Sequence, residues 1–174
     1  AGAPMPGWNA LFLSVSSFCT AGFSPFHDSL CSFSNNITIN ITVAALSYAG
    51  AMGFIVITDL TNKLRGRTTS LSFTSKVILL ITGIMTVGGT VILSVSPSIA
   101  PGDSAGEKIW LSFFQTMSAM TTVGYNTIDL SALRPGPILM FSLIMFIGAS
   151  PSGTGGGVKC TSVSAVWGFI ISKL

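Results

Sequence analysis

The chain has 174 residues, of which 49% are hydrophobic and only 7% are charged, and its mean hydropathy is +0.74. A soluble domain would carry about a quarter of charged residues, so the composition predicts an all-α membrane protein, since helices satisfy their own backbone in lipid. The net charge of +3 is small, and no basic cluster with interleaved aromatic residues indicates a nucleic-acid partner. The three cysteines show no metal-ligand spacing and are expected to be packing residues.

The first re-entrant candidate, residues 8–19, is apolar but too short to cross a bilayer. Residues 37–57 and 77–95 follow, and both are uncharged and long enough to span about 30 Å of hydrocarbon. The stretch from Asp59 to Lys76 between them carries four cations against one anion, which places it on the cytoplasmic side. The next connection, residues 96–109, is then the outer one.

Residues 110–121 form a second short apolar segment of the same kind. Both short segments must enter and leave on the outer face for the remaining topology to close. With this arrangement the last crossing ends inside, at Lys173. The sequence therefore predicts the order re-entrant segment, span, span, re-entrant segment, span, in a multi-pass protein of the plasma membrane or bacterial inner membrane.

The third span is interrupted. Residues 138–149 are apolar but would cover only about 18 Å at 1.5 Å per residue, and a second apolar half follows at residues 160–172. Unpaired backbone at membrane depth is tolerated only against protein or a water-filled cavity, so a broken helix with an intramembrane loop is predicted. The residues assigned to this loop are Ser150, Gly153, Gly155, Gly156, Gly157 and Lys159.

The two re-entrant segments are copies of one another at an offset of 102 residues, and each ends in Thr-x-Gly-aromatic. At this offset Trp8 aligns with Trp110, Phe12 with Phe114, Ser16 with Ser118, Thr20 with Thr122 and Gly22 with Gly124. Such self-similarity indicates repeated helix–loop–helix units. We expect a first unit at residues 1–62 that lacks its leading helix, a cytoplasmic linker at 63–76 and a complete unit at 77–174, within a longer protein.

The repeated ending suits a cation-selective pore loop. Backbone carbonyls can replace the water around a cation, and threading them toward an axis needs backbone angles that glycine adopts readily. The negative C-terminal end of each short helix would face the ion. Thr122-Val123-Gly124-Tyr125-Asn126 resembles the potassium-channel filter Thr-Val-Gly-Tyr-Gly, with a looser copy at residues 19–23. The expected filter residues are Cys19, Thr20, Ala21, Gly22 and Phe23 with Thr121, Thr122, Val123, Gly124 and Tyr125.

The chain resembles the Trk/Ktr/HKT superfamily of potassium transporters. The resemblance lies in the two filter segments, in the Gly50–Gly53 pair and in the stretch from Phe146 to Lys159. The resemblance implies four helix–pore–helix repeats around one axis, of which this chain would hold the second, in part, and the third. Pro151 is followed here by Ser152 and Gly153, where the family usually has Gly and then Ser.

The same resemblance implies how transport would be controlled. The loop from Gly153 to Lys159 would lie beneath the filter and obstruct the cavity until a cytoplasmic nucleotide-binding regulatory subunit changes state. It also implies a homodimer of four-repeat subunits in membrane lipid. Both filter segments keep glycine, which favours potassium over sodium, and the transported ion is the only ligand expected, without a cofactor.

Several alternatives remain at this stage. Lys159 has two interpretations. It lies at a functional or water-facing position, because burying an unpaired charge costs at least about 2.5 kcal/mol, or its side chain extends toward the cytoplasmic surface. Asp129 either attracts cations or ties down a turn. The two filter glycines could be turn residues, but this leaves their common outer side unexplained. A secondary transporter that binds a solute at the broken helix is the main rival, and a two-repeat subunit that dimerises is the third arrangement.

An enzyme is not expected. The single histidine, His27, has no triad partner or nearby carboxylate pair in the sequence. The glycine-rich loop is not a phosphate-binding P-loop either, because Val158 precedes Lys159 where that motif has glycine and Cys160 follows where it has Ser or Thr.

Overall fold

The computed structural model describes residues 5–97, 99 and 104–173. Its helices are α1 (Pro6–Phe18), α2 (Ile37–Leu64), α3 (Phe73–Ser94), α4 (Ala105–Thr121), α5 (Pro135–Phe146) and α6 (Cys160–Lys173), with 3-10 turns at Cys31–Phe33 and Leu130–Ala132. Among the described residues the extended pairing is limited to one bridge between Ile147 and Val158. The all-α prediction is confirmed.

The two uninterrupted spans are α2 and α3, which are long and apolar enough to cross a membrane. The helix α2 continues seven residues beyond the predicted run, to Leu64, and so includes Asp59. The Asp59 carboxylate accepts hydrogen bonds from Ser75 Oγ (2.6 Å) and from the N–H (3.2 Å) and hydroxyl of Ser72. It therefore ties the C-terminal end of α2 to the start of α3.

Helix starts follow from local chemistry. Asn36 and Ser72 cap α2 and α3 by accepting the N–H groups of Ile39 and Ser75. Ser104 and Glu107 form a reciprocal capping box at α4. The predicted outer connection lies partly outside the described residues, at Asp103 and its neighbours.

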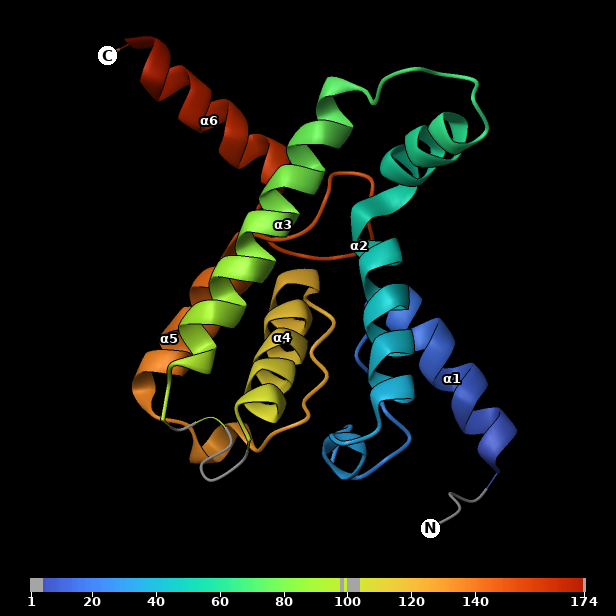
Figure 1. Cartoon of the computed structure of the whole chain (residues 1–174), viewed down its shortest axis with the longest axis vertical. Helices are drawn as coiled ribbons and strands as arrows, with labels where there is room; N and C mark the ends of the chain where they lie inside the picture. Colours follow the sequence, from blue (N-terminus) through green and yellow to red (C-terminus); the bar gives the residue numbers. More distant parts are fainter. Residues whose placement is uncertain (1–4, 98, 100–103, 174) are drawn as a thin grey trace.

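The arrangement in space matches the predicted topology (Figure 1). Helices α1 and α4 start at the lower end of the molecule, stop at mid-height, and the chain after each returns to that same end. Helices α2 and α3 run in opposite directions and extend above the level where α1 and α4 stop, and the basic connection between them lies at the upper end. Both re-entrant segments thus enter from one face, opposite to the basic connection.

The third span is broken as predicted. Helix α5 ends at Phe146 and α6 begins at Cys160, and the loop between them crosses the centre of the molecule from α3 toward α2 (Figure 1). The two ends of the loop lie side by side and run parallel, with Gly148 N–H bonded to the Val158 carbonyl (3.0 Å) and Ala149 N–H bonded to the Gly156 carbonyl (3.0 Å). These bonds satisfy backbone groups that lipid could not.

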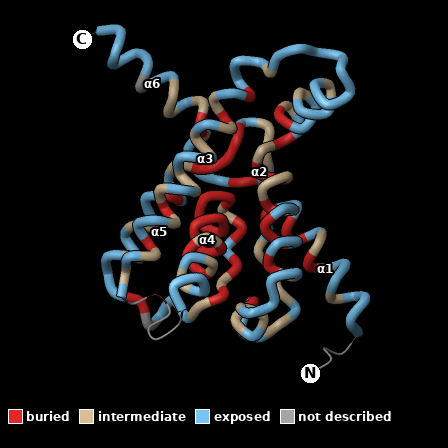
Figure 2. Tube along the Cα trace, viewed as in Figure 1, coloured by how far each residue is buried: buried red, intermediate tan, exposed pale blue. Residues whose placement is uncertain are grey.

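The centre of the packing is α4. Ten of its residues are buried, against three in α1, and Figure 2 shows buried residues gathered on α4 and the crossing loop while the outer helices are largely exposed. One apolar cluster joins the two repeats through Leu13, Leu30, Val43, Ala44, Phe114, Met117, Val123 and Tyr125. Exposed apolar side chains on α3, such as Leu80, Ile84 and Val87, suit contact with lipid.

The two glycines of α2 lie where other parts of the backbone approach closely. A Cβ atom on Gly50 would lie 1.8 Å from the Phe18 carbonyl oxygen, and one on Gly53 would lie 2.3 Å from the Ser152 carbonyl carbon. Gly53 also has a φ of 73°, so it interrupts α2 with a kink. The crossing loop occupies the space beside this kink.

Candidate ion pathway

Both pore segments begin with the same backbone geometry. After α1 and α4 end, the chain turns through positive φ angles at Thr20 (49°) and Thr122 (58°) and again at Gly22 (73°) and Gly124 (83°). These are the pairs that the 102-residue repeat aligns. A positive φ is strained for threonine but open to glycine, so the repeat extends to the backbone conformation itself.

The hydrogen bonds of the two segments also repeat. Ser16 Oγ donates to the Phe23 carbonyl (2.9 Å), and Ser118 Oγ donates to the Tyr125 carbonyl (2.6 Å). At the inner end each threonine hydroxyl donates to the carbonyl before it, at 2.8 Å for Thr20 and 2.7 Å for Thr122. Each short helix thus fixes its own return segment at both ends.

Between these fixed ends the carbonyl oxygens have no partner. Among the described residues, no hydrogen bond uses the carbonyl of residues 20–22 or 122–124. Buried backbone acceptors are almost always paired, and two of these residues, Thr20 and Val123, are buried. Two stretches of three free carbonyls at equivalent places are what a cation-binding layer requires.

The two segments meet closely. A Cβ atom on Gly22 would lie 1.9 Å from the Val123 carbonyl oxygen, whereas one on Gly124 would meet nothing within 4 Å in this chain. Glycine at position 22 is therefore required both by its φ angle and by the neighbouring segment. Helices α1 and α4 end at these segments, so their negative dipole ends lie beside the free carbonyls.

Further contacts join the outer ends of the two repeats. The Tyr125 hydroxyl lies 2.8 Å from Ser16 Oγ and 3.0 Å from the Phe23 carbonyl oxygen. Leu30 N–H donates to the Asn126 carbonyl (3.0 Å), and Asn126 N–H donates to Ser29 Oγ (3.1 Å). The segments are thus held together as well as individually.

A buried glutamine supports the return segment after the second pore loop. With its amide oxygen facing that segment, the Gln115 side chain accepts the N–H groups of Thr127 (3.0 Å) and Ile128 (3.2 Å). Gln115 lies on α4, so the pore helix itself holds the chain that leaves the filter.

The intramembrane loop contacts the inner end of both segments. Gly156 N–H donates to Thr122 Oγ1 (2.6 Å), and Thr154 Oγ1 lies 3.1 Å from Thr20 Oγ1. Thr154 Oγ1 also donates to the Phe18 carbonyl at the end of α1 (3.1 Å). The loop therefore lies across the inner side of the candidate filter.

The loop needs its glycines because backbones approach closely there. A Cβ atom on Gly153 would lie 1.9 Å from the Ala51 carbonyl oxygen, and one on Gly155 would lie 2.7 Å from the Thr121 carbonyl oxygen. Gly157 has a φ of 78°. Glycine at position 153 is thus accounted for by contact with α2, despite the changed order of residues in this stretch.

Lys159 and Asp129 have local roles in the structure. Lys159 Nζ donates to the Gly155 carbonyl (2.7 Å), so its charge is turned back onto the loop. Asp129 accepts the N–H (2.9 Å) and hydroxyl (2.7 Å) of Ser131, which ties down a turn and lowers the pKa of this carboxyl. Within the described residues, no group of three His, Cys, Asp or Glu side chains could hold a metal ion.

Sequence reasoning missed three contacts in this region: the hydroxyl of Tyr125, the hydroxyl of Thr154 and the amide of Gln115. The aligned Ser16 and Ser118 were visible as part of the repeat, and their role as helix-to-filter donors could have been inferred from it.

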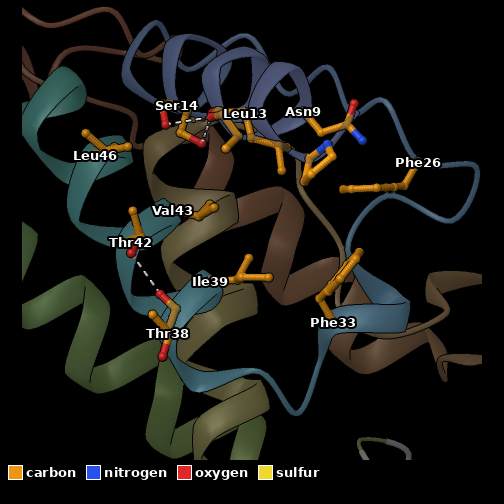
Figure 3. A pocket seen from close by; sticks show the side chains of 13 residues that line it. Asn9, Leu13, Ser14, Phe26, Phe33, Thr38, Ile39, Thr42, Val43 and Leu46 are labelled. Atoms are coloured by element: carbon orange, nitrogen blue, oxygen red, sulfur yellow. Dashed lines mark hydrogen bonds between the residues drawn. The ribbon is translucent and has the colours of Figure 1, made fainter. Parts of the chain in front are cut away.

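An open apolar groove of about 340 Å³ lies between α1 and the first half of α2. Figure 3 shows Leu13 and Ser14 of α1 facing Ile39 and Val43 of α2 across it. At the 102-residue offset, Ser14 aligns with Thr116 of α4. The Thr116 methyl group packs against Gly89 of α3, where an added Cβ atom would lie 2.5 Å from it. In the second repeat, helix α3 covers this face of the pore helix α4. The equivalent face of α1 lines the open groove.

Two re-entrant helices on one face, each followed by a glycine-centred segment with free carbonyls, define a pore-loop membrane protein with the potassium-channel-like helix–loop–helix fold. Residues 2–174 match the TrkH family, described as cation transport proteins. The chain belongs to this family.

Individual relatives support the assignment. The chain is 33% identical to "Ktr system potassium uptake protein B" of Vibrio alginolyticus and 31% identical to the protein of that name in Bacillus subtilis, in each case over 98% of this chain and 40% of the relative. It is 31% identical to "Potassium/sodium uptake protein NtpJ" of Enterococcus hirae, over 90% of this chain. The chain thus spans 35–40% of the length of these curated relatives.

A solved structure shows the same fold. The potassium transporter TrkH from Vibrio parahaemolyticus superposes with a TM-score of 0.75 at 20% identity, covering 92% of this chain and 34% of that one.

Proposed function

We propose that this chain contributes two of the filter segments of a potassium-conducting pore. The free carbonyls of residues 20–22 and 122–124 would replace part of the ion's hydration shell, with Cys19, Thr121, Phe23 and Tyr125 closing the two segments at their ends. The observation that carries the proposal is the repeated pattern, in which each segment is fixed at both ends and leaves three carbonyls unpaired.

Potassium is the ion that the sequence and the relatives favour. Both segments have glycine at the centre, as in the potassium-channel filter, and two of the similar proteins are named for potassium uptake. A third is named for potassium and sodium, so the discrimination between these two ions is the property to measure.

We further propose that the intramembrane loop is the gate. The gating residues would lie beneath the filter segments. They are Ser150, Gly153, Gly155, Gly156, Gly157 and Lys159. Support comes from the hydrogen bonds of Thr154 and Gly156 to the inner ends of both segments. In this position the loop would obstruct ions that leave the filter, and its release would open the path.

The remaining pore would come from repeats outside this chain. The open groove beside α1 supports a helix that precedes it, and the coverage of about 40% of the relatives leaves room for two more repeats. On this proposal residues 1–62 are part of one unit, 63–76 the linker and 77–174 a complete unit. The full protein would form a homodimer in membrane lipid with a cytoplasmic nucleotide-binding regulatory subunit.

The rival reading, a secondary transporter with a solute site at the broken helix, is less well supported. Both re-entrant segments enter from the same face (Figure 1), which gives repeats of parallel orientation around an axis normal to the membrane. A two-repeat subunit that dimerises is also less well supported, since the similar proteins are more than twice as long as the matched region.

The test is ion uptake by cells that lack their own potassium transporters and express the full reading frame containing this chain. Wild-type protein is expected to restore potassium uptake, and Gly124→Ser is expected to admit sodium because a side chain at a φ of 83° displaces the filter backbone. Gly83→Ser on α3 is the matched control, since a Cβ atom there meets nothing within 4 Å. Robust uptake that is indifferent to Gly124 would refute the filter assignment.

A further inference from the structure

The Tyr125 side chain is the contact that crosses from one filter segment to the carbonyl of the other. It is fully buried, with 0% of its surface exposed, within the apolar cluster that joins the two repeats. Its hydroxyl lies 3.0 Å from the Phe23 carbonyl oxygen and 2.8 Å from Ser16 Oγ. A buried hydroxyl is costly unless it is hydrogen-bonded, so these two groups define where the ring can sit.

The Phe23 carbonyl is supported from two sides as a result. Ser16 Oγ donates to it from its own pore helix, as Ser118 Oγ donates to the equivalent Tyr125 carbonyl. The Tyr125 hydroxyl supplies a second donor from the neighbouring repeat. A carbonyl oxygen has two lone pairs, so both donors can bind at once and fix its direction.

The arrangement is not symmetrical. The residue that aligns with Tyr125 is Phe23, which lacks a hydroxyl and has 69% of its surface exposed. Only the second segment can therefore position the first through this side chain. The next residue continues the connection, because the Asn126 carbonyl accepts the Leu30 N–H and the Asn126 N–H donates to Ser29 Oγ.

We propose that Tyr125 is a positioning residue for selectivity, whose hydroxyl sets the place of the first filter segment relative to the second. The position of the first segment matters most at Gly22 and Val123, where the two segments are closest. A Cβ atom on Gly22 would lie 1.9 Å from the Val123 carbonyl oxygen. Selectivity depends on how the coordinating oxygens are spaced and how freely they move. This inference rests on the proposed potassium function and adds a residue whose side chain binds no ion.

The test is Tyr125→Phe in the full-length protein, with Tyr48→Phe as the matched control. Tyr48 is the other tyrosine of the chain, and its hydroxyl bonds to Thr86 Oγ1 (2.8 Å) between α2 and α3 rather than to a filter segment. Purified proteins are reconstituted in liposomes, and potassium and sodium fluxes are measured under identical gradients. Loss of a hydrogen bond changes an equilibrium by about two- to tenfold.

The potassium-to-sodium flux ratio of Tyr125→Phe is expected to fall by that factor, while Tyr48→Phe keeps the wild-type ratio. An unchanged ratio in Tyr125→Phe would overturn the inference, and so would an equal fall in both variants. Should Tyr125→Phe fail to fold, Ser16→Ala is compared with Ser118→Ala. Both remove a helix-to-carbonyl bond, but only Ser16 also contacts the Tyr125 hydroxyl, so a fall in the ratio that is no larger for Ser16→Ala than for Ser118→Ala would overturn the inference. Wild-type protein without potassium flux would instead refute the proposed function.

Discussion

The substitution Thr154→Val tests whether the loop is held against the filter. Thr154 Oγ1 makes two contacts, at 3.1 Å to Thr20 Oγ1 and 3.1 Å to the Phe18 carbonyl, and valine removes both without changing the side-chain shape. A net contribution of about 1 kcal/mol is reasonable for an exposed hydroxyl that water can partly replace. Such a loss shifts the balance between closed and open loop by about fivefold.

The assay is rubidium flux into liposomes that contain the purified full-length protein without a regulatory partner. If the closed loop dominates, the flux scales with the open fraction, so Thr154→Val should leak about five times faster than wild type. Thr154→Ser keeps the hydroxyl and should retain the slow flux. A valine variant as slow as wild type, or a serine variant as fast as valine, would show that these contacts do not restrain the gate.

Two further predictions concern stability and filter geometry. Gly22→Ala should abolish potassium flux, because the new Cβ would lie 1.9 Å from the Val123 carbonyl oxygen and the φ of 73° adds about 1–2 kcal/mol of strain. Gly83→Ala is the control and is expected to preserve flux. Normal flux in Gly22→Ala would contradict the close packing of the two segments. Asp59→Ala should lower the thermal unfolding midpoint, since the Asp59 carboxylate accepts hydrogen bonds from Ser72 and Ser75. The potassium-to-sodium flux ratio should stay unchanged. A wild-type midpoint in a thermal-shift assay would show that this contact is dispensable.

The elements that the sequence predicted are those with a local signature. Apolar runs of different length separated the two full spans from the re-entrant segments, and their helices now begin or end within a few residues of the expected places. The glycine-rich interruption predicted the broken third span in the same way, because a helix cannot continue through Ser150–Gly157. Entry of both re-entrant segments from one face followed from the charge asymmetry of the connections together with the requirement that the remaining topology close.

The contacts that were not predicted join residues far apart in the chain. Tyr125 bonds to Ser16 across 109 positions, and Thr154 approaches Thr20 across 134. No periodicity or motif links such pairs, and a hydroxyl at either place has many other uses. The kink at Gly53 belongs to the same class, since its φ of 73° depends on the loop that packs beside it rather than on neighbours in sequence.

The hydrogen bonds at both ends of each proposed filter segment explain why its carbonyls stay unpaired. A free chain would rotate its peptide groups until each carbonyl found a donor, but here the serine on each pore helix holds the outer end and a threonine hydroxyl holds the inner end. Between these points the backbone passes through two positive φ angles, at Thr20 and Gly22 in the first segment. The strain is therefore maintained by the surrounding structure, and the carbonyls that it leaves unpaired are free to accept a cation, as the proposed function requires.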